Sequence, residues 1–260
     1  MVLPREQVLA GCRHRPELEA LVALAEQALR TWEPQWSGFV AAAVREEAEQ
    51  RLGALSELEL HSAGGWPQAE RRRLLLRRAE LEADPTPAPL MGLVVSGNFL
   101  FDPAEPADVR RALELGGAAG EAIGDIWMRG DRGAQLVTTP ELAAALHGQG
   151  ALVRTVEVQL EALALDQLQL PAQRIPKQLS SVEASLRLDA VASAGFGLSR
   201  SRMAELIRGG AVRINWQPVS SPSKELAAGD RVQLQGRGEL EILEIQPTKR
   251  ERWRLLMRRS

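Results

Sequence analysis

Serine and arginine alternate just before an apolar helical stripe, a pattern that suits phosphate binding. The segment reads Ser199-Arg200-Ser201-Arg202, and apolar residues at helical spacing follow it. Ser199 is a good N-cap, and the free N–H groups and dipole of a first helical turn attract anions. Guanidinium groups at Arg200 and Arg202 suit bidentate contacts with phosphate. The spacing therefore predicts an anion site where this helix begins.

Four further cations flank this helix and complete the set of predicted phosphate contacts: Arg187, Arg208, Arg213 and Lys224. Two of them also have an ordinary interpretation. Arg187 could pair with Asp189 or another carboxylate, and Arg208 could face solvent. Contacts of this kind raise affinity for a polyanion without specifying its sequence.

No residue pattern predicts catalysis, a cofactor or a metal site. The glycine run 116–124 lacks the spacing of a nucleotide-binding loop and is better interpreted as a turn. His14, His61 and His147 share no ligand spacing, and Cys12 is the one cysteine. A lone cysteine is typical of a reducing compartment. We expect a cytoplasmic, monomeric protein without membrane insertion, since no apolar run approaches the length that spans a bilayer.

Charge is distributed unevenly along the 260 residues. The whole chain has a net charge of −2, but residues 1–173 have a net charge of −9 and residues 174–260 one of +7. Only three of the 32 basic residues are lysines, which a GC-rich genome would explain as well as phosphate recognition would. The asymmetry predicts that contact with a polyanion is concentrated at the C-terminal end.

The N-terminal part, residues 1–55, reads as helical. Apolar residues recur at helical spacing over 18–32 and again over 39–52. Trp32 and Trp36 flank a proline, so we expect them to pack where the two helices meet.

Residues 56–170 predict an α+β sheet of ferredoxin-like or RNA-recognition-motif type. The expected elements are listed in chain order: strand 56–62, basic helix 67–82, strand 90–96, helix 106–115, strands 125–130 and 134–139, helix 141–150 and strand 152–163. The paired aromatics with which an RNA-recognition motif stacks bases are missing, so the sheet is expected to be a platform. The basic helix could be a second RNA surface or a solvated face paired with Glu70 and Glu80.

Residues 171–181 read as a polar linker, and residues 182–247 as two short helices followed by a hairpin. Gly195 and Gly197 are expected to break the first helix, and Gly209-Gly210 to end the second. Residues 248–260 read as a basic tail that extends the positive charge.

The C-terminal segment resembles the S4 RNA-binding domain. The elements that carry the resemblance occur in order: Arg187-Leu188-Asp189, Ser199-Arg200-Ser201, Leu206-Ile207-Arg208, Gly210, Val212-Arg213-Ile214-Asn215 and Gly229-Asp230. One departure is Trp216, where the family usually has Gly after the Asn.

The narrower YlmH-type family shares the pair Asn215-Trp216. It also resembles this chain in Gly236-Arg237-Gly238, in the tail TKRERWRL and in the segment from Ile123 to Ile126. The resemblance implies an N-terminal part, an RNA-recognition-like domain and a C-terminal S4 domain, together with ribosome association and roles in rescue of large subunits or in cell division. Cyanobacterial members are often labelled photosystem II S4 domain proteins, but no residue here implies a photosystem contact.

These observations favour a non-enzymatic protein that binds structured rRNA or tRNA on the large ribosomal subunit. One alternative is an RNA-modifying enzyme that the S4 domain delivers, because pseudouridine synthases carry a catalytic Arg-Leu-Asp. Here Leu186 precedes that motif and no Thr follows, so we assign Asp189 to helix structure. The other alternative is an assembly factor linked to photosystem II or to cell division.

Overall fold

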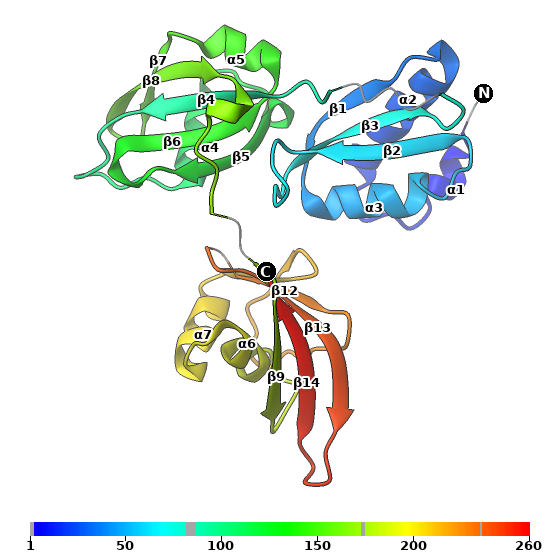
Figure 1. Ribbon diagram of the computed structural model, residues 1–260, viewed down its shortest axis with the longest axis vertical. Coiled ribbons are helices and arrows are strands. Elements are labelled where there is room, and N and C mark those ends of the chain that lie inside the picture. The colour runs from blue at the N-terminus through cyan, green and yellow to red at the C-terminus, as the bar shows by residue number, and fades with distance from the viewer. Residues whose placement is uncertain (1–2, 82–86, 173–174, 235) are drawn as a thin grey trace. The chain divides into compact units, whose positions relative to one another are not determined.

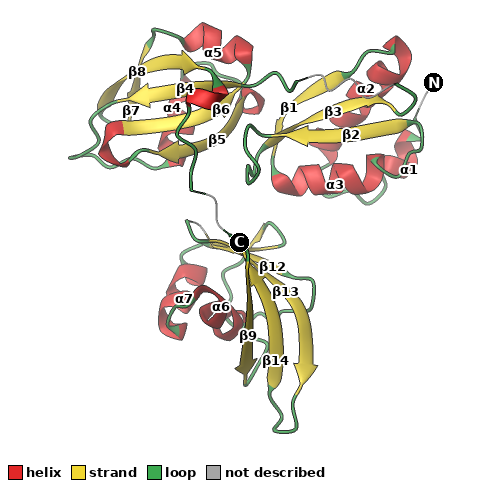
Figure 2. Ribbon diagram, in the orientation of Figure 1, coloured by secondary structure: helices red, strands yellow, loops and turns green. Residues whose placement is uncertain are grey.

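The chain folds into two compact units, Met1–Pro171 and Ala172–Ser260. The computed structural model describes residues 3–81, 87–172, 175–234 and 236–260 (Figures 1 and 2). Both units combine helices with antiparallel sheets, so the predicted α+β class is confirmed. Among the described residues, none of the helices is both long and apolar enough to cross a membrane.

The first sheet of unit 1 has the order β1-β3-β2, and all its pairings are antiparallel. Helix α2 packs against β1 and β3. Leu18, Leu21 and Leu29 of α2 bury themselves against Leu74 and Leu76 of β3, which explains the helical spacing of the first apolar stripe. The elements are α1 (Arg5–Leu9), α2 (Arg15–Thr31), β1 (Gln35–Val40), α3 (Ala42–Leu52), β2 (Leu58–Ala63) and β3 (Arg72–Arg78).

Two helices predicted in this region differ from the structure. Residues 35–40 form strand β1, so the predicted helix 39–52 begins only at Ala42, and the rest of it is helical. The predicted basic helix 67–82 is instead strand β3, which carries four consecutive buried residues, Leu74 to Arg77. A continuous apolar run fits a strand covered on both faces as well as it fits a helix, and periodicity alone does not separate them. Because β1 pairs with β3, and β3 pairs with β2, one sheet extends across the predicted boundary at residue 55.

The arginines of this strand are engaged within the protein. Arg73 Nε donates to Ser37 O over 2.6 Å and Arg78 Nε donates to Leu29 O over 2.9 Å. Arg72 likewise donates to the carbonyl oxygens of Ala69 and Pro67. Neither predicted role, an RNA surface or a solvated face, describes these side chains, although Arg78 also pairs with Glu80.

The second sheet of unit 1 has the order β5-β6-β4-β8-β7, again antiparallel throughout. Without β7, its chain order β-α-β-β-α-β is that of ferredoxin-like sheets, as predicted; the likeness to RNA-recognition motifs stays a prediction. The predicted strand 152–163 is two strands, because the chain turns at Arg154-Thr155. The elements are β4 (Met91–Ser96), α4 (Pro106–Leu115), β5 (Ile123–Met128), β6 (Gly133–Thr138), α5 (Pro140–Leu146), β7 (Gly150–Val153) and β8 (Val156–Leu163).

Unit 2 is a six-stranded sheet of order β11-β10-β12-β13-β14-β9, and α6 and α7 pack together on it (Figure 2). The predicted linker and tail are wrong in part: residues 177–183 and 253–259 are paired strands, β9 and β14. The elements are β9 (Lys177–Glu183), α6 (Leu188–Phe196), α7 (Arg200–Arg208), β10 (Val212–Ile214), β11 (Gln217–Pro218), β12 (Arg231–Leu234), β13 (Gly238–Pro247) and β14 (Trp253–Arg259).

Candidate RNA-binding site

The two helices of unit 2 meet at a tight turn that the sequence encodes. Gly197 ends α6 with a φ of 67°, a left-handed conformation that glycine adopts without strain. The Ser199 hydroxyl accepts a hydrogen bond from Arg202 N over 3.2 Å, so the predicted N-cap of α7 is confirmed. Gly195 does not break α6 but lies inside it, where an added Cβ would collide with the Leu240 side chain.

Asp189 brings Arg187 and Arg200 together. Its carboxylate accepts two hydrogen bonds of 3.1 Å from Arg187, and two of 3.1 and 3.2 Å from Arg200. The Asp189 side chain is 8% exposed, whereas those of Arg187 and Arg200 are 39% and 54% exposed. The buried carboxylate therefore holds two accessible guanidinium groups beside the first turn of α7.

The pKa of Asp189 is lowered from its ordinary value. Burial works to raise this pKa, but the hydrogen bonds and the charges of Arg187 and Arg200 favour the carboxylate and outweigh burial. Asp189 thus stays ionised at neutral pH. The sequence interpretation of Asp189 as a helix residue missed this role, although pairing with Arg187 had been considered.

Lys224 lies along the start of α6. Its carbonyl oxygen accepts from Leu188 N over 2.7 Å, and Asp189 N donates to Pro222 O over 3.0 Å. The Lys224 side chain is exposed. Three of the predicted contacts, Arg187, Arg200 and Lys224, consequently border the beginning of α6.

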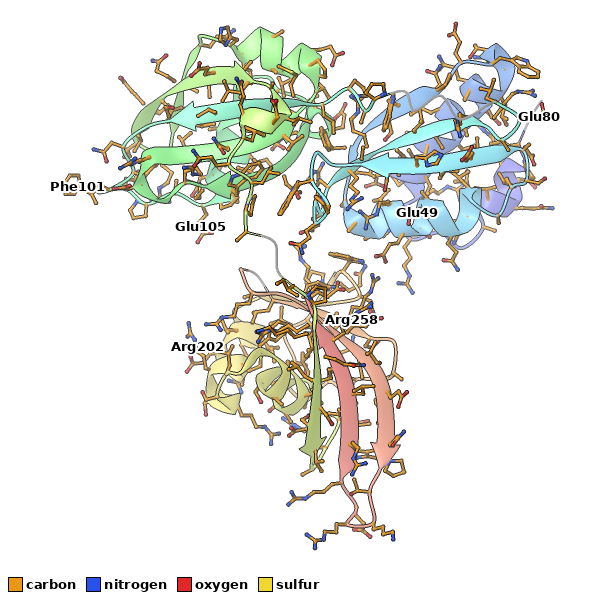
Figure 3. The ribbon with its side chains drawn as sticks, viewed as in Figure 1. Glu49, Glu80, Phe101, Glu105, Arg202 and Arg258 are labelled. Atoms are coloured by element: carbon orange, nitrogen blue, oxygen red, sulfur yellow. The ribbon has the colours of Figure 1, made fainter. Side chains whose placement is uncertain are left out.

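The other predicted arginines lie on α7 and on β10. Arg202 pairs with Glu205 over 2.9 Å on the exposed face of α7, and Figure 3 shows its side chain directed into solvent. Arg208 occupies the exposed last turn of α7, and Arg213 projects from β10.

The turn after β10 shows why glycine is usual at the position of Trp216. Asn215 and Trp216 have φ values of 48° and 68°, so both central residues of this hairpin turn are left-handed. Glycine is the usual second residue of such a turn, and Trp216 is strained there. The side chain of Asn215 fixes the turn. Its Nδ2 donates to the Asp230 carboxylate over 2.8 Å, and its Oδ1 accepts from Arg231 N over 2.9 Å.

Comparison with known proteins agrees with this arrangement. Residues 13–81 match the model of the YlmH N-terminal domain, and residues 186–232 match the S4 domain. The chain is similar to "Ribosome-associated protein quality control protein P2" of Bacillus subtilis strain 168, with 28% identity over 206 residues that cover 79% of each chain. A solved structure titled "Cell division protein ylmH from Streptococcus pneumoniae" aligns with a TM-score of 0.46 and 14% identity, covering 59% of this chain and 92% of that one.

The two matched domains occupy the two units in the order that the sequence motifs implied. The first spans the β1-β3-β2 sheet, and the second spans α6, α7 and the strands β10 to β12. In both of these regions the chain is similar to YlmH-type S4 domain proteins.

Proposed function

We propose that this protein binds structured RNA without catalysing a reaction, and that unit 2 supplies the phosphate contacts. One observation carries the proposal: Asp189 orients Arg187 and Arg200 beside the N-terminus of α7, within an S4 domain. Accessible guanidinium groups held by a buried carboxylate are preorganised for phosphate, because little side-chain freedom remains to be lost on binding. Ser199, Arg202, Arg208, Arg213 and Lys224 extend this contact surface.

The preferred target is rRNA or tRNA on the large ribosomal subunit, in a cytoplasmic protein. Support comes from the relative in Bacillus subtilis, whose name describes ribosome-associated quality control. Unit 1 carries a net charge of −9, so bulk RNA repels it. We propose that unit 1 contributes specificity and unit 2 contributes affinity.

Asp189 is a poor candidate for a catalytic carboxylate. It is buried, and both of its oxygens accept hydrogen bonds from arginine. The alternative of an RNA-modifying enzyme therefore gains no support from this Arg-Leu-Asp motif.

The direct test replaces Arg200 and Arg202 together with Ala in the full chain. Each charge-assisted contact that is lost should weaken RNA binding by roughly 1.5–3 kcal/mol. Arg237→Ala with Arg254→Ala is the matched control, because it removes two exposed arginines of unit 2 outside the site. Equal RNA affinity of the two double variants in a filter-binding titration would place the phosphate site elsewhere.

Sedimentation tests the ribosomal target. At moderate salt the full chain should co-sediment with large rather than small subunits, and residues 172–260 alone should do so less well. Migration of all the protein at the top of the gradient would leave RNA binding intact and remove the ribosome from the proposal.

A further inference from the structure

Unit 1 contains an open cleft that the proposed RNA contact does not use. Its volume is about 300 Å³, and it is lined by residues of the β2–β3 loop, of β5 and of the segment that ends unit 1: Trp66, Gln68, Glu70, Asp125, Trp127 and Pro171. A volume of this size is at the lower limit for a small-molecule or side-chain site.

Two indole rings form the aromatic part of this cleft. The rings of Trp66 and Trp127 are inclined at 50°, and their centroids are 6.2 Å apart. Trp127 is held because its Nε1 donates to Gln169 O over 3.0 Å. Trp66 follows Gly65, whose φ of 86° is left-handed and at which an added Cβ would lie 3.1 Å from the Val137 side chain. Both rings are therefore positioned by the fold.

Two carboxylates line the same cleft. Asp125 is fixed, since its oxygens accept from Glu70 N over 2.7 Å and from Arg71 N over 2.9 Å. Glu70 is exposed. The nearby cation, Arg71, is directed elsewhere, because its guanidinium donates to the carbonyl oxygens of Phe39, Gly120 and Ile123.

We propose that this cleft binds an arginine or lysine side chain from a basic protein segment. Trp faces attract cations through the ring quadrupole more strongly than other aromatic faces do, and the carboxylates of Glu70 and Asp125 add opposite charge. Unit 1 as a whole is also negatively charged, with a net charge of −9 over residues 1–171, and so attracts cations. A nucleobase could also stack on these rings, but the phosphates attached to it would be repelled. The site would give unit 1 a protein contact separate from the RNA contact of unit 2.

The test uses the full chain and a fluorescein-labelled peptide, Gly-Arg-Gly-Arg-Gly, with a citrulline peptide as its uncharged twin. We expect the arginine peptide to bind at least about tenfold more tightly than the citrulline peptide, as measured by anisotropy. Glu70→Gln and Trp66→Leu should each weaken binding about three- to tenfold. Glu161→Gln is the matched control, because it removes an exposed carboxylate of β8 outside the cleft.

Three results would overturn the proposal. The first is equal binding of the two peptides. The second is a loss for Glu161→Gln as large as that for Glu70→Gln, which would indicate attraction to acidic surface in general. The third is an oligouridylate whose binding Trp66→Leu weakens while peptide binding is unchanged, which would make the cleft a base site. Trp66→Leu could disturb folding, but Glu70→Gln changes an exposed side chain. The Glu70→Gln variant therefore tests the proposal independently of Trp66→Leu.

Discussion

Replacing Asp189 with Asn separates two possible roles for the carboxylate between Arg187 and Arg200. If Asp189 only neutralises these arginines, its loss adds positive charge and RNA should bind more tightly. If it positions them, RNA should bind less tightly although the net charge has become more favourable. The side chain of Asn has nearly the same shape, but only its single carbonyl oxygen can accept from the two guanidinium groups.

The structure limits the size of the effect on stability. Asp189 is 8% exposed and accepts four hydrogen bonds from charged groups, which by itself would indicate a large loss. Both guanidinium groups are more than a third exposed, however, so water screens the pairs and partly replaces them. We expect Asp189→Asn to lower the free energy of unfolding of unit 2 by about 1–2 kcal/mol.

The pH dependence of this loss follows from the lowered pKa of Asp189. A carboxyl whose pKa is lower in the folded than in the unfolded state stabilises the fold above the unfolded value, here ordinarily 3.8. That stability is lost as the pH falls through the folded-state pKa, which lies below 3.8. The difference between the parent and Asp189→Asn should therefore be constant near neutrality and shrink only in acid below this value.

Urea unfolding of residues 172–260 at several pH values measures the stability, and RNA titration of the full chain measures the affinity. We expect RNA affinity to fall about three- to tenfold, the equivalent of one weakened charge-assisted contact. Tighter RNA binding by the variant would refute the positioning role. A stability difference unchanged at pH 3 would refute the ionisation argument.

Three other predictions address the units separately. Residues 172–260 should bind structured RNA with a log–log salt slope of order −3 to −5 if four or five phosphates are contacted, and salt-insensitive binding would exclude the phosphate mechanism. Deleting residues 253–260 should prevent unit 2 from folding, as seen by circular dichroism, because β14 lies between β13 and β9 in the sheet and contributes the buried Leu255 and Met257. Cooperative unfolding of the shortened chain would show instead that the fold does not need β14. Gly133→Ala should destabilise unit 1 by about 2–3 kcal/mol in thermal unfolding, because the φ of Gly133 is 129° and the new Cβ would overlap Val95 O. Gly130→Ala should lower the stability less, because the space around its Cβ is open.

Features that depend on neighbouring residues could be predicted from the amino-acid sequence. The Ser199 cap, the Gly197 stop and the apolar stripe of α7 act within one or two helical turns, so α6 and α7 could be predicted together with the cations around them. The helix 106–115 was likewise predicted at its observed bounds, because the proline at its start and the glycines after its end are local signals. The order of the S4 motifs also identified the domain.

Features that join distant segments could not be predicted, because they depend on long-range pairing. The run from Arg72 to Arg78 is a strand because β1 and β2 pair with it on either side, and Arg73 donates to a carbonyl oxygen of β1. The C-terminal segment is a strand because β9, about 75 residues earlier in the chain, pairs with it. Asp189 reaches Arg200 only because the turn at Gly197 folds α7 back toward α6. Trp66 and Trp127 meet across 61 positions of sequence. Long-range pairing satisfies backbone groups and charges that the local sequence leaves open, and local patterns therefore cannot predict it.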